Sequence, residues 1–172
     1  IYKMILEGGL FSTSLDTSPK LRMSIVCGES IVYGFPLEYE FYITDLNGEV
    51  HTIVRKEDPI PKFTSEDKAE IRRALKRHKD AEFPKHKSYF YFIYSDDEGR
   101  IYVQTSQGRK FRRNVKTFDV FSREGYCLYR IDIPYTPLKI YKGYLYSYTE
   151  DEGTGDTRVK RYKINNWDQI KV

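Results

Sequence analysis

Short runs of apolar residues, separated by turns that contain glycine, recur along this chain of 172 residues. Runs of this kind, joined in pairs by tight turns, predict β-hairpins rather than helices. Hairpins are predicted at residues 21–35, 40–55, 89–105, 117–133 and 138–148, and a further single strand at residues 158–164. The pattern therefore indicates an all-β protein made of consecutive antiparallel strands.

The hairpins repeat at a fixed interval. Ile101 and Leu145 are 44 residues apart, and so are Phe118 and Tyr162. A repeat of this length that holds four short strands is typical of one blade of a β-propeller. The spacing therefore predicts β-propeller blades, and it favours them over a β-sandwich.

One segment interrupts the repeat. The spacing from Phe41 to Phe118 is 77 residues, which exceeds the repeat by 33 and matches an insert at residues 57–88. The insert contains no strand pattern. A helix is predicted at residues 65–79.

The start of this helix has a recognisable signal. Thr64 and Ser65 are both suitable N-cap residues, and Asp67 follows Thr64 at the spacing of a capping box. The insert is therefore expected to be a short helix between two blades.

The pattern of apolar and polar residues within individual strands supports an arrangement in blades. Residues 89–94 are apolar without alternation, which predicts an inner strand buried on both faces, with the core strand of a β-sandwich as the alternative. Residues 49–55 mix polar and apolar positions, which predicts an exposed outer strand. The first strand of each blade is thus expected inside and the last at the rim.

The strand count predicts an incomplete ring. Residues 1–6 resemble residues 128–133 and are interpreted as an orphan outer strand. Blades are predicted at residues 21–56 and 89–134, and an unfinished blade at residues 138–165, all within a single partial propeller domain. Propellers usually close with four to eight blades, so three blades leave open faces that other material must cover.

Two arrangements would complete the ring. In the favoured arrangement, the chain is the C-terminal half of a longer propeller and the missing N-terminal half supplies the other blades. In the other, a homodimer forms a six-bladed ring in which each chain donates residues 1–6 to the unfinished blade of the second chain.

Composition adds little to this picture. Aromatic residues make up 16% of the chain, which favours strands, and the formal net charge of +4 comes from interspersed charges of both signs. Cys27 and Cys127 lack the paired spacing of a zinc site and are expected to be unpaired. No apolar run is long enough to predict a membrane span or a signal peptide.

Four stretches resemble a known family, the bacterial six-bladed β-propeller proteins related to NHL-repeat propellers. These stretches are FPKHKSYF at residues 83–90, SDDEGRIYVQT at 95–105, FDVFSREGYCLYRIDIP at 118–134 and VKRYKINNW at 159–167. The resemblance implies a six-bladed ring, commonly on exported or cell-envelope proteins whose biochemical roles are mostly unassigned. It implies no catalytic motif, and a full member has about twice as many residues as this chain.

Candidate ligand-binding residues lie in the insert, which is expected to cross one face of the ring. Lys85, His86 and Lys87 precede the predicted inner strand and offer cationic donors to an anionic ligand at the mouth of the channel. Arg72 and Arg73 lie on the basic face of the predicted helix. The alternative for all five residues is a solvated surface.

Motifs for catalysis, metals and cofactors are not found. The acidic residues 96–99 and 151–156 fit hairpin turns better than a calcium loop. His51, His78 and His86 do not have the spacing of a metalloprotease, and no nucleophile elbow is present. The sequence therefore predicts a non-enzymatic binding or scaffold module. The alternatives are a propeller hydrolase or lyase with a metal in its channel, and a nucleic-acid-binding protein, which is disfavoured because most tyrosines fall on predicted core strands.

Overall fold

A computed structural model describes residues 19–74, 85–106, 115–135, 137–150 and 154–170 of the chain. Within these residues the protein is all-β apart from one short helix and one 3₁₀ turn, and no sheet closes into a barrel. The predicted fold class is confirmed at this level. Residues 1–6, interpreted above as an orphan strand, lie outside the described residues.

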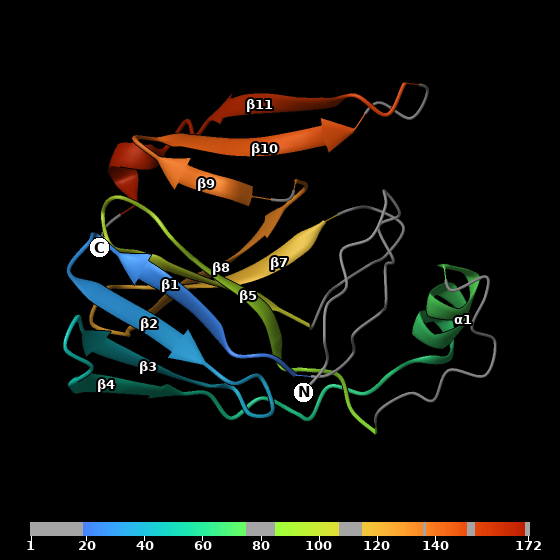
Figure 1. Ribbon diagram of the computed structural model, residues 1–172, viewed down its shortest axis with the longest axis horizontal. Coiled ribbons are helices and arrows are strands. Elements are labelled where there is room, and N and C mark those ends of the chain that lie inside the picture. The colour runs from blue at the N-terminus through green and yellow to red at the C-terminus, as the bar shows by residue number, and fades with distance from the viewer. Residues whose placement is uncertain (1–18, 75–84, 107–114, 136, 151–153, 171–172) are drawn as a thin grey trace, which may run out of the picture.

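The strands form three antiparallel sheets, in each of which every strand pairs with its neighbour in the sequence (Figure 1). Sheet A contains β1 (Arg22–Val26), β2 (Ser30–Gly34), β3 (Glu40–Asp45) and β4 (Val50–Arg55). Sheet B contains β5 (Phe90–Ser95), β6 (Ile101–Thr105), β7 (Lys116–Phe121) and β8 (Cys127–Ile133). Sheet C, as far as the described residues show, contains β9 (Pro137–Tyr141), β10 (Tyr144–Glu150) and β11 (Thr157–Lys163). All of the predicted hairpins are therefore confirmed.

The three sheets follow one another as layers, with sheet B between sheets A and C (Figure 1). Their first strands lie together, because β5 contacts both β1 and β9. The fold thus repeats one unit, a meander whose first strand lies beside the first strand of the next sheet.

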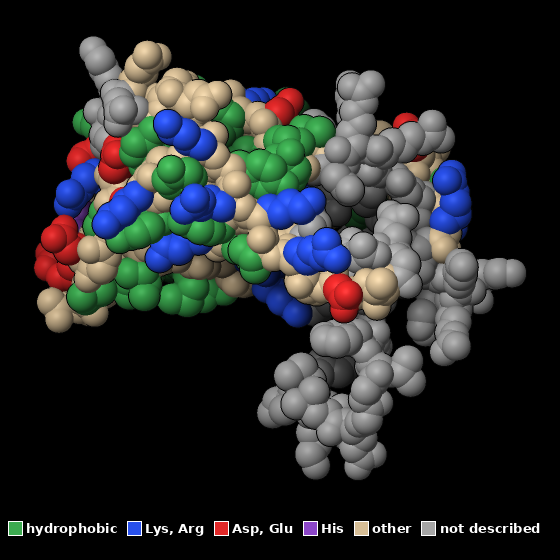
Figure 2. Space-filling view, turned by 90° about the horizontal axis from the view of Figure 1, so that it is seen from above, with side chains coloured by type: hydrophobic (Ala, Val, Ile, Leu, Met, Phe, Trp, Pro, Cys, Tyr) green, Lys and Arg blue, Asp and Glu red, His purple; other side chains and the backbone are tan. Residues whose placement is uncertain are grey.

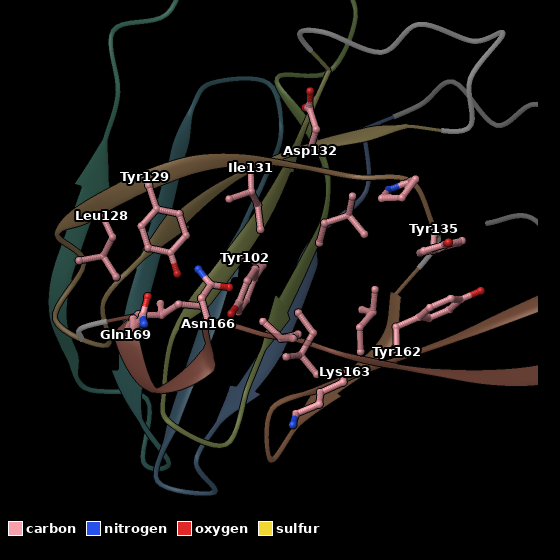
Figure 3. A pocket seen from close by; sticks show the side chains of 16 residues that line it. Tyr102, Leu128, Tyr129, Ile131, Asp132, Tyr135, Tyr162, Lys163, Asn166 and Gln169 are labelled. Carbon is pink, nitrogen blue, oxygen red and sulfur yellow. The ribbon is translucent and has the colours of Figure 1, made fainter.

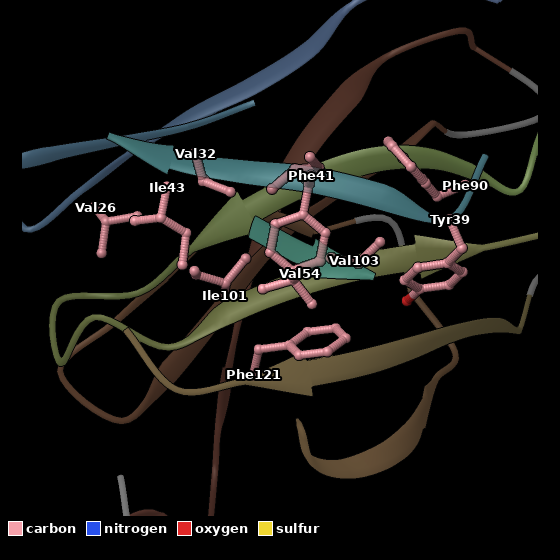
Figure 4. Close-up of a cluster of buried hydrophobic side chains, with 11 residues drawn as sticks. Val26, Val32, Tyr39, Phe41, Ile43, Val54, Phe90, Ile101, Val103 and Phe121 are labelled. Atoms are coloured by element: carbon pink, nitrogen blue, oxygen red, sulfur yellow. The ribbon is translucent and has the colours of Figure 1, made fainter. Parts of the chain in front are cut away.

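A core of aliphatic and aromatic side chains fills the space between sheets A and B (Figure 4). Phe41 on β3 packs edge-on against Phe121 on β7, with ring centroids 5.1 Å apart. Val32 and Val103 are completely buried in the same cluster. A second core cluster lies between sheets B and C and includes Tyr102, Phe118 and Leu145.

The burial of β5 differs from the prediction. Residues 89–94 were expected to be buried on both faces, but only Phe90 and Ile93 of β5 are buried, and Phe92 is exposed. The strand that is buried throughout is β6. The middle of sheet B is covered on one side by sheet A and on the other by sheet C, whereas along β5 only part of each face is covered: Phe90 and Ile93 pack in the first core cluster and Tyr94 packs against the second.

Three of the hairpin turns share the same hydrogen bonds between a side-chain oxygen and the backbone of the turn. The side-chain oxygens of Asp45, Asp96 and Ser122 each accept hydrogen bonds from the backbone N–H groups two and four residues later. A glycine with positive φ stands three residues after each of them. These are turns with a glycine bulge, in which a short polar side chain satisfies the exposed backbone donors. The prediction of a hairpin turn at residues 96–99 is confirmed.

The insert contains helix α1 (Ser65–Ala74), which begins where the sequence predicts; residues 75–79 of the predicted helix lie outside the described residues. Its capping box is formed, because Thr64 Oγ1 accepts a hydrogen bond from the Asp67 N–H at 3.1 Å and Asp67 Oδ2 accepts one from the Thr64 N–H at 2.8 Å. No helix among the described residues is long and apolar enough to cross a membrane. Cys27 and Cys127 are both free thiols, as expected.

Candidate functional site

The predicted ligand-binding residues lie at the two ends of the insert. Arg72 and Arg73 are exposed in the last turn of α1, and Lys85 is exposed at the start of the segment that leads to β5. His86 is half-buried, and its Nδ1 is buried without a hydrogen-bond partner. Figure 1 shows α1 to one side of the three sheets.

Lys87 is engaged within the protein. Its ammonium group pairs with the buried carboxylate of Asp67 at 2.5 Å, and its backbone N–H donates to the carbonyl oxygen of Pro61 at 2.8 Å. These two contacts hold the C-terminal end of the insert, at Lys87, against its N-terminal part, at Pro61 and Asp67. A role of these five residues in binding an anion remains a prediction.

A cavity of about 690 Å³ lies between sheets B and C (Figure 3). Its walls come from β6, β8, β9, β10, β11 and the 3₁₀ helix η2 (Trp167–Gln169) with its flanking residues. The side chains that line it are mainly aliphatic or aromatic: Tyr102, Leu128, Tyr129, Ile131, Ile133, Pro134, Tyr135, Ile140, Leu145, Tyr162, Ile164 and Ile170. Asp132, Lys163, Asn166 and Gln169 complete the lining.

The cavity arises because sheets B and C are packed less completely than sheets A and B. Between sheets A and B, large rings from both sides, such as Phe41 and Phe121, meet in the middle. On the far side of sheet B, Leu128, Tyr129 and Ile131 of β8 are only partly buried. An apolar surface with this volume and shape is typical of a ligand pocket.

One polar group in the cavity has no partner. The hydroxyl oxygen of Tyr129 is buried and makes no hydrogen bond, and it is directed toward Asn166 and Gln169 (Figure 3). Burial raises the pKa of this phenol and outweighs the opposing positive charge of Arg100, and the negative charges of Asp96 and Glu98 add to the rise, so the group is a neutral O–H. A buried hydroxyl that lacks a partner costs about 1–3 kcal/mol, which a ligand with a hydrogen-bonding group would recover.

The opposite end of the cavity is formed by a pair of stacked rings. Tyr135 and Tyr162 have ring centroids 4.0 Å apart and nearly parallel planes. Figure 3 shows this pair on the side of the cavity away from Tyr129. The cavity thus extends from an aromatic end to a polar end.

A buried ion pair fixes the polar end. Arg100 is fully buried, and its Nε donates to Asp96 Oδ2 at 2.6 Å. Its Nη1 donates to the carbonyl oxygen of Ile170 at 3.0 Å, and its guanidinium carbon lies 3.9 Å from the centroid of the Trp167 ring. Tyr102 adds a hydrogen bond to Asp96 at 2.9 Å. Arg100 therefore holds η2 in place against sheet B.

A second buried carboxylate joins sheets A and B. Asp119 on β7 accepts hydrogen bonds from the Tyr39 hydroxyl at 2.7 Å, the Lys56 ammonium at 2.8 Å and Arg130 Nε at 2.6 Å. Burial opposes ionisation of Asp119, but the hydrogen bonds from Arg130, Lys56 and Tyr39 outweigh it and lower the pKa of the carboxyl. Because every oxygen of Asp119 is occupied, this cluster serves to connect the sheets.

Metal ligands do not gather at any of these sites. In the described part of the chain, no three His, Cys, Asp or Glu side chains lie close enough together to hold a metal ion. The carboxylate of Asp96 is used by its own hairpin turn and by Arg100.

Comparison with known proteins finds no family model and no curated protein that matches this chain. The functional interpretation therefore depends on the geometry described above.

Sequence reasoning did not identify the cavity. One signal was present, since Tyr129, Ile131 and Ile133 alternate along β8 and so form one apolar face. That alternation indicates a buried surface. The sequence alone does not indicate how far from it the next sheet lies.

Proposed function

We propose that this chain is a non-enzymatic binding module built from propeller-type blades, and that it binds an apolar ligand between sheets B and C. The observation that carries the proposal is the cavity of about 690 Å³ with the unpartnered Tyr129 hydroxyl at one end. Ligand pockets usually combine apolar walls with a few polar groups that orient the ligand.

The arrangement of the sheets supports the propeller-type architecture. Each sheet is a meander of sequential strands, and the first strands β1, β5 and β9 lie next to one another. This is the arrangement expected if the first strands surround a common axis and the last strands lie at the rim. The resemblance to six-bladed bacterial propellers, with their common location outside the cytoplasm or in the envelope, is part of the same proposal.

The lining of the cavity defines the class of ligand. Rings and branched aliphatic chains form the walls, so the body of the ligand is apolar and aromatic or branched. The hydroxyl of Tyr129, with the amides of Asn166 and Gln169 nearby, favours one terminal group that donates or accepts a hydrogen bond. A planar aromatic alcohol is the simplest molecule of this class.

Naphthalene and 2-naphthol test this proposal, since they differ by one hydroxyl group. We expect calorimetric titration to show both binding to the wild-type protein, with 2-naphthol binding about fivefold to tenfold more tightly, as one added hydrogen bond provides. In Tyr129→Phe this preference should largely disappear while naphthalene binds as before.

Substitutions that fill the cavity give the second arm of the test. Leu128→Phe and Ile131→Phe add volume inside the cavity and should weaken both probes at least tenfold. Leu46→Phe, at an exposed position in the turn between β3 and β4, is the matched control and should leave binding unchanged. Absence of binding to the wild-type protein, or equal binding to the filled variants, would overturn the proposal.

A further inference from the structure

Sheet A has an apolar face that the described residues leave uncovered. Met23, Tyr33, Tyr42 and Ile53 are paired in one row across all four strands, so their side chains lie on the same face. The neighbouring row, from Ser24 to Thr52, contains Val32 and Ile43 and faces sheet B. Sheet A therefore presents apolar side chains on both of its faces.

The exposure of this face is considerable. Leu21 and Met23 are each 57% exposed, Ile25 is 58% exposed and Ile53 is 50% exposed. Tyr33 and Tyr42 stack between them with ring centroids 5.3 Å apart. Isolated exposed apolar residues are normal on proteins, but a continuous patch of them marks a surface that another molecule covers.

The free face of sheet C has a different character. Two rows cross this sheet on the side away from sheet B: Lys139, Tyr146 and Arg161 form one, and Tyr141 and Tyr144 form the other. The Arg161 guanidinium carbon lies 4.6 Å from the centroid of the Tyr144 ring. Figure 2, which is seen from above the molecule as drawn in Figure 1, looks along sheet C from its β11 edge and shows Lys and Arg side chains spread among hydrophobic ones. Tyrosine and arginine are both enriched in protein interfaces.

The two free faces belong to sheets of opposite charge. The strands and tight turns of sheet A carry acidic side chains at Glu29, Glu40, Asp45 and Glu49, and basic ones at Arg22 and Arg55. Those of β9, β10 and β11 and the turn between β9 and β10 carry basic side chains at Lys139, Lys142, Arg158, Lys160, Arg161 and Lys163. Glu40 pairs with Arg55 and Glu29 with Arg123, so the opposite charge of the two sheets acts by steering them together and not through these carboxylates as ion pairs across the interface.

We propose that two copies of this chain pair about a two-fold axis, with the free face of sheet A in each copy packed on the free face of sheet C in the other. Face-to-face packing of successive sheets already joins A to B and B to C, and the pairing continues the same stack. The proposal rests on the propeller-type architecture proposed above. The site is complete only with the second copy, because each copy supplies one half of each interface.

The number of sheets selects a pair over a larger assembly. A head-to-tail contact of this kind either closes into a ring or continues as a filament. Two copies bring six sheets together, which lies inside the range of about four to eight blades in closed propellers, whereas three copies would bring nine. A two-fold pair is thus the closed form that suits this chain.

A protein partner accounts for both free faces. A single-stranded nucleic acid would stack on the tyrosines of sheet C and neutralise its cations, but it would leave the uncharged row of sheet A in water. The apolar row from Met23 to Ile53 needs an apolar cover, and the tyrosine rings of sheet C supply one.

Sedimentation equilibrium tests the pairing. We expect the wild-type protein to have twice the mass of one 20.5 kDa chain. Met23→Glu places a charge in the row of sheet A, and Tyr146→Glu places one in the row of sheet C. In a pair of two identical variant chains, the added charge lies in both interfaces. Each variant should therefore raise the dissociation constant of the pair at least a hundredfold. Leu46→Glu puts the same charge at an exposed leucine outside the face, and this control should remain paired.

A mixture of the two variants separates this arrangement from other dimers. When Met23→Glu and Tyr146→Glu are mixed, the mixed pair contains one unmodified interface, so pairs should reappear at concentrations where each variant alone is a single chain. A dimer that joins sheet A to sheet A would leave Tyr146→Glu paired by itself, which would overturn the proposal. A single-chain wild-type protein, a filament whose mass grows with concentration, or retention of an oligonucleotide that Tyr146→Glu abolishes would also overturn it.

Naphthalene binding distinguishes this proposal from the proposed function. The cavity lies on the opposite face of sheet C from Tyr144 and Tyr146, so the single-chain variants should bind naphthalene like the wild type. Retained binding also shows that both variants are folded. If pairing fails while naphthalene binds, only the pairing is wrong, and if naphthalene fails to bind to a stable pair, only the cavity proposal is wrong.

Discussion

Arg100 on sheet B and Trp167 on the last 3₁₀ turn lie in contact, with the guanidinium carbon 3.9 Å from the centroid of the indole ring. The same guanidinium group pairs with Asp96 and donates a hydrogen bond to the carbonyl of Ile170. One fully buried side chain therefore closes a hairpin turn and anchors the C-terminal end of the described chain.

Replacement of this side chain is expected to weaken the fold and release η2. Arg100→Met should lower the free energy of unfolding by about 3 kcal/mol, because it leaves the buried Asp96 carboxylate without its cation. The single tryptophan of the chain should then become more exposed, and its fluorescence should shift to longer wavelength. Urea denaturation and emission spectra measure the two effects.

An exposed arginine provides the control for this prediction. Arg123 is about half-exposed and pairs with the exposed carboxylates of Glu29 and Glu124. Arg123→Met should change the stability by less than about 0.5 kcal/mol, since surface ion pairs contribute little. Equal losses in the two variants would contradict a special role of the buried pair.

Asp119 should make the stability depend on pH. Its folded-state pKa lies below the ordinary value of 3.8, because hydrogen bonds from Arg130, Lys56 and Tyr39 outweigh the cost of burial. The stabilisation is therefore fully present above the unfolded pKa and is lost as the pH falls through the folded pKa. Asp119→Asn should cost about 3 kcal/mol at pH 7 and much less in acid. Urea midpoints between pH 2 and pH 7 test this expectation, and parallel profiles for the two proteins would contradict it.

Two glycines with the same backbone conformation should respond differently to alanine. Gly125 has a φ of 92° and Gly48 a φ of 90°, so both substitutions carry the strain of the left-handed region, about 1–2 kcal/mol. At Gly48 a Cβ atom meets nothing within 4 Å, but at Gly125 it would lie 2.6 Å from Val54 Cγ2, across the interface between sheets A and B. Gly125→Ala should therefore be less stable than Gly48→Ala by at least about 1 kcal/mol, the usual cost of overpacking. Thermal denaturation of the two variants measures the difference.

Asp67 is expected to keep the ends of the insert together. Its carboxylate caps α1 through Thr64 and pairs with Lys87, and the hydrogen bonds from both residues outweigh burial and lower its pKa. Asp67→Ala should speed amide exchange in α1, since loss of a cap costs about 1 kcal/mol and the buried ion pair is lost with it. Ser65→Ala, next to the capping residue, should leave exchange nearly unchanged. Slow exchange in Asp67→Ala would show that the insert is held by other contacts.

The sequence predicts the hairpins and the helix well because their signals are local. A short polar residue followed by glycine, as at Asp45 or Asp96, specifies a turn without help from the rest of the chain. Thr64 and Asp67 likewise fix the start of α1 within four residues. These features depend on neighbours in the sequence, and they are the features that the structure confirms.

Burial and the candidate site depend on distant contacts and are therefore harder to predict. The apolar run at the start of β5 predicts burial on both faces, but only Phe90 and Ile93 of this strand are buried, and Phe92 is exposed. The contact of Arg100 with Trp167, and the distance between β8 and sheet C that creates the cavity, depend on how whole sheets pack. No periodicity along the chain contains that information.

The pairing of every strand with its sequence neighbour has a consequence for biosynthesis. Sheet A needs no later residue to complete the backbone hydrogen bonds between its strands, so its meander can form on the ribosome while sheet B is still being translated. Each following sheet then finds a finished surface on which to pack. Among the described strands, none pairs with a strand of another sheet, so each of the three sheets can complete its ladder as soon as its own residues are made.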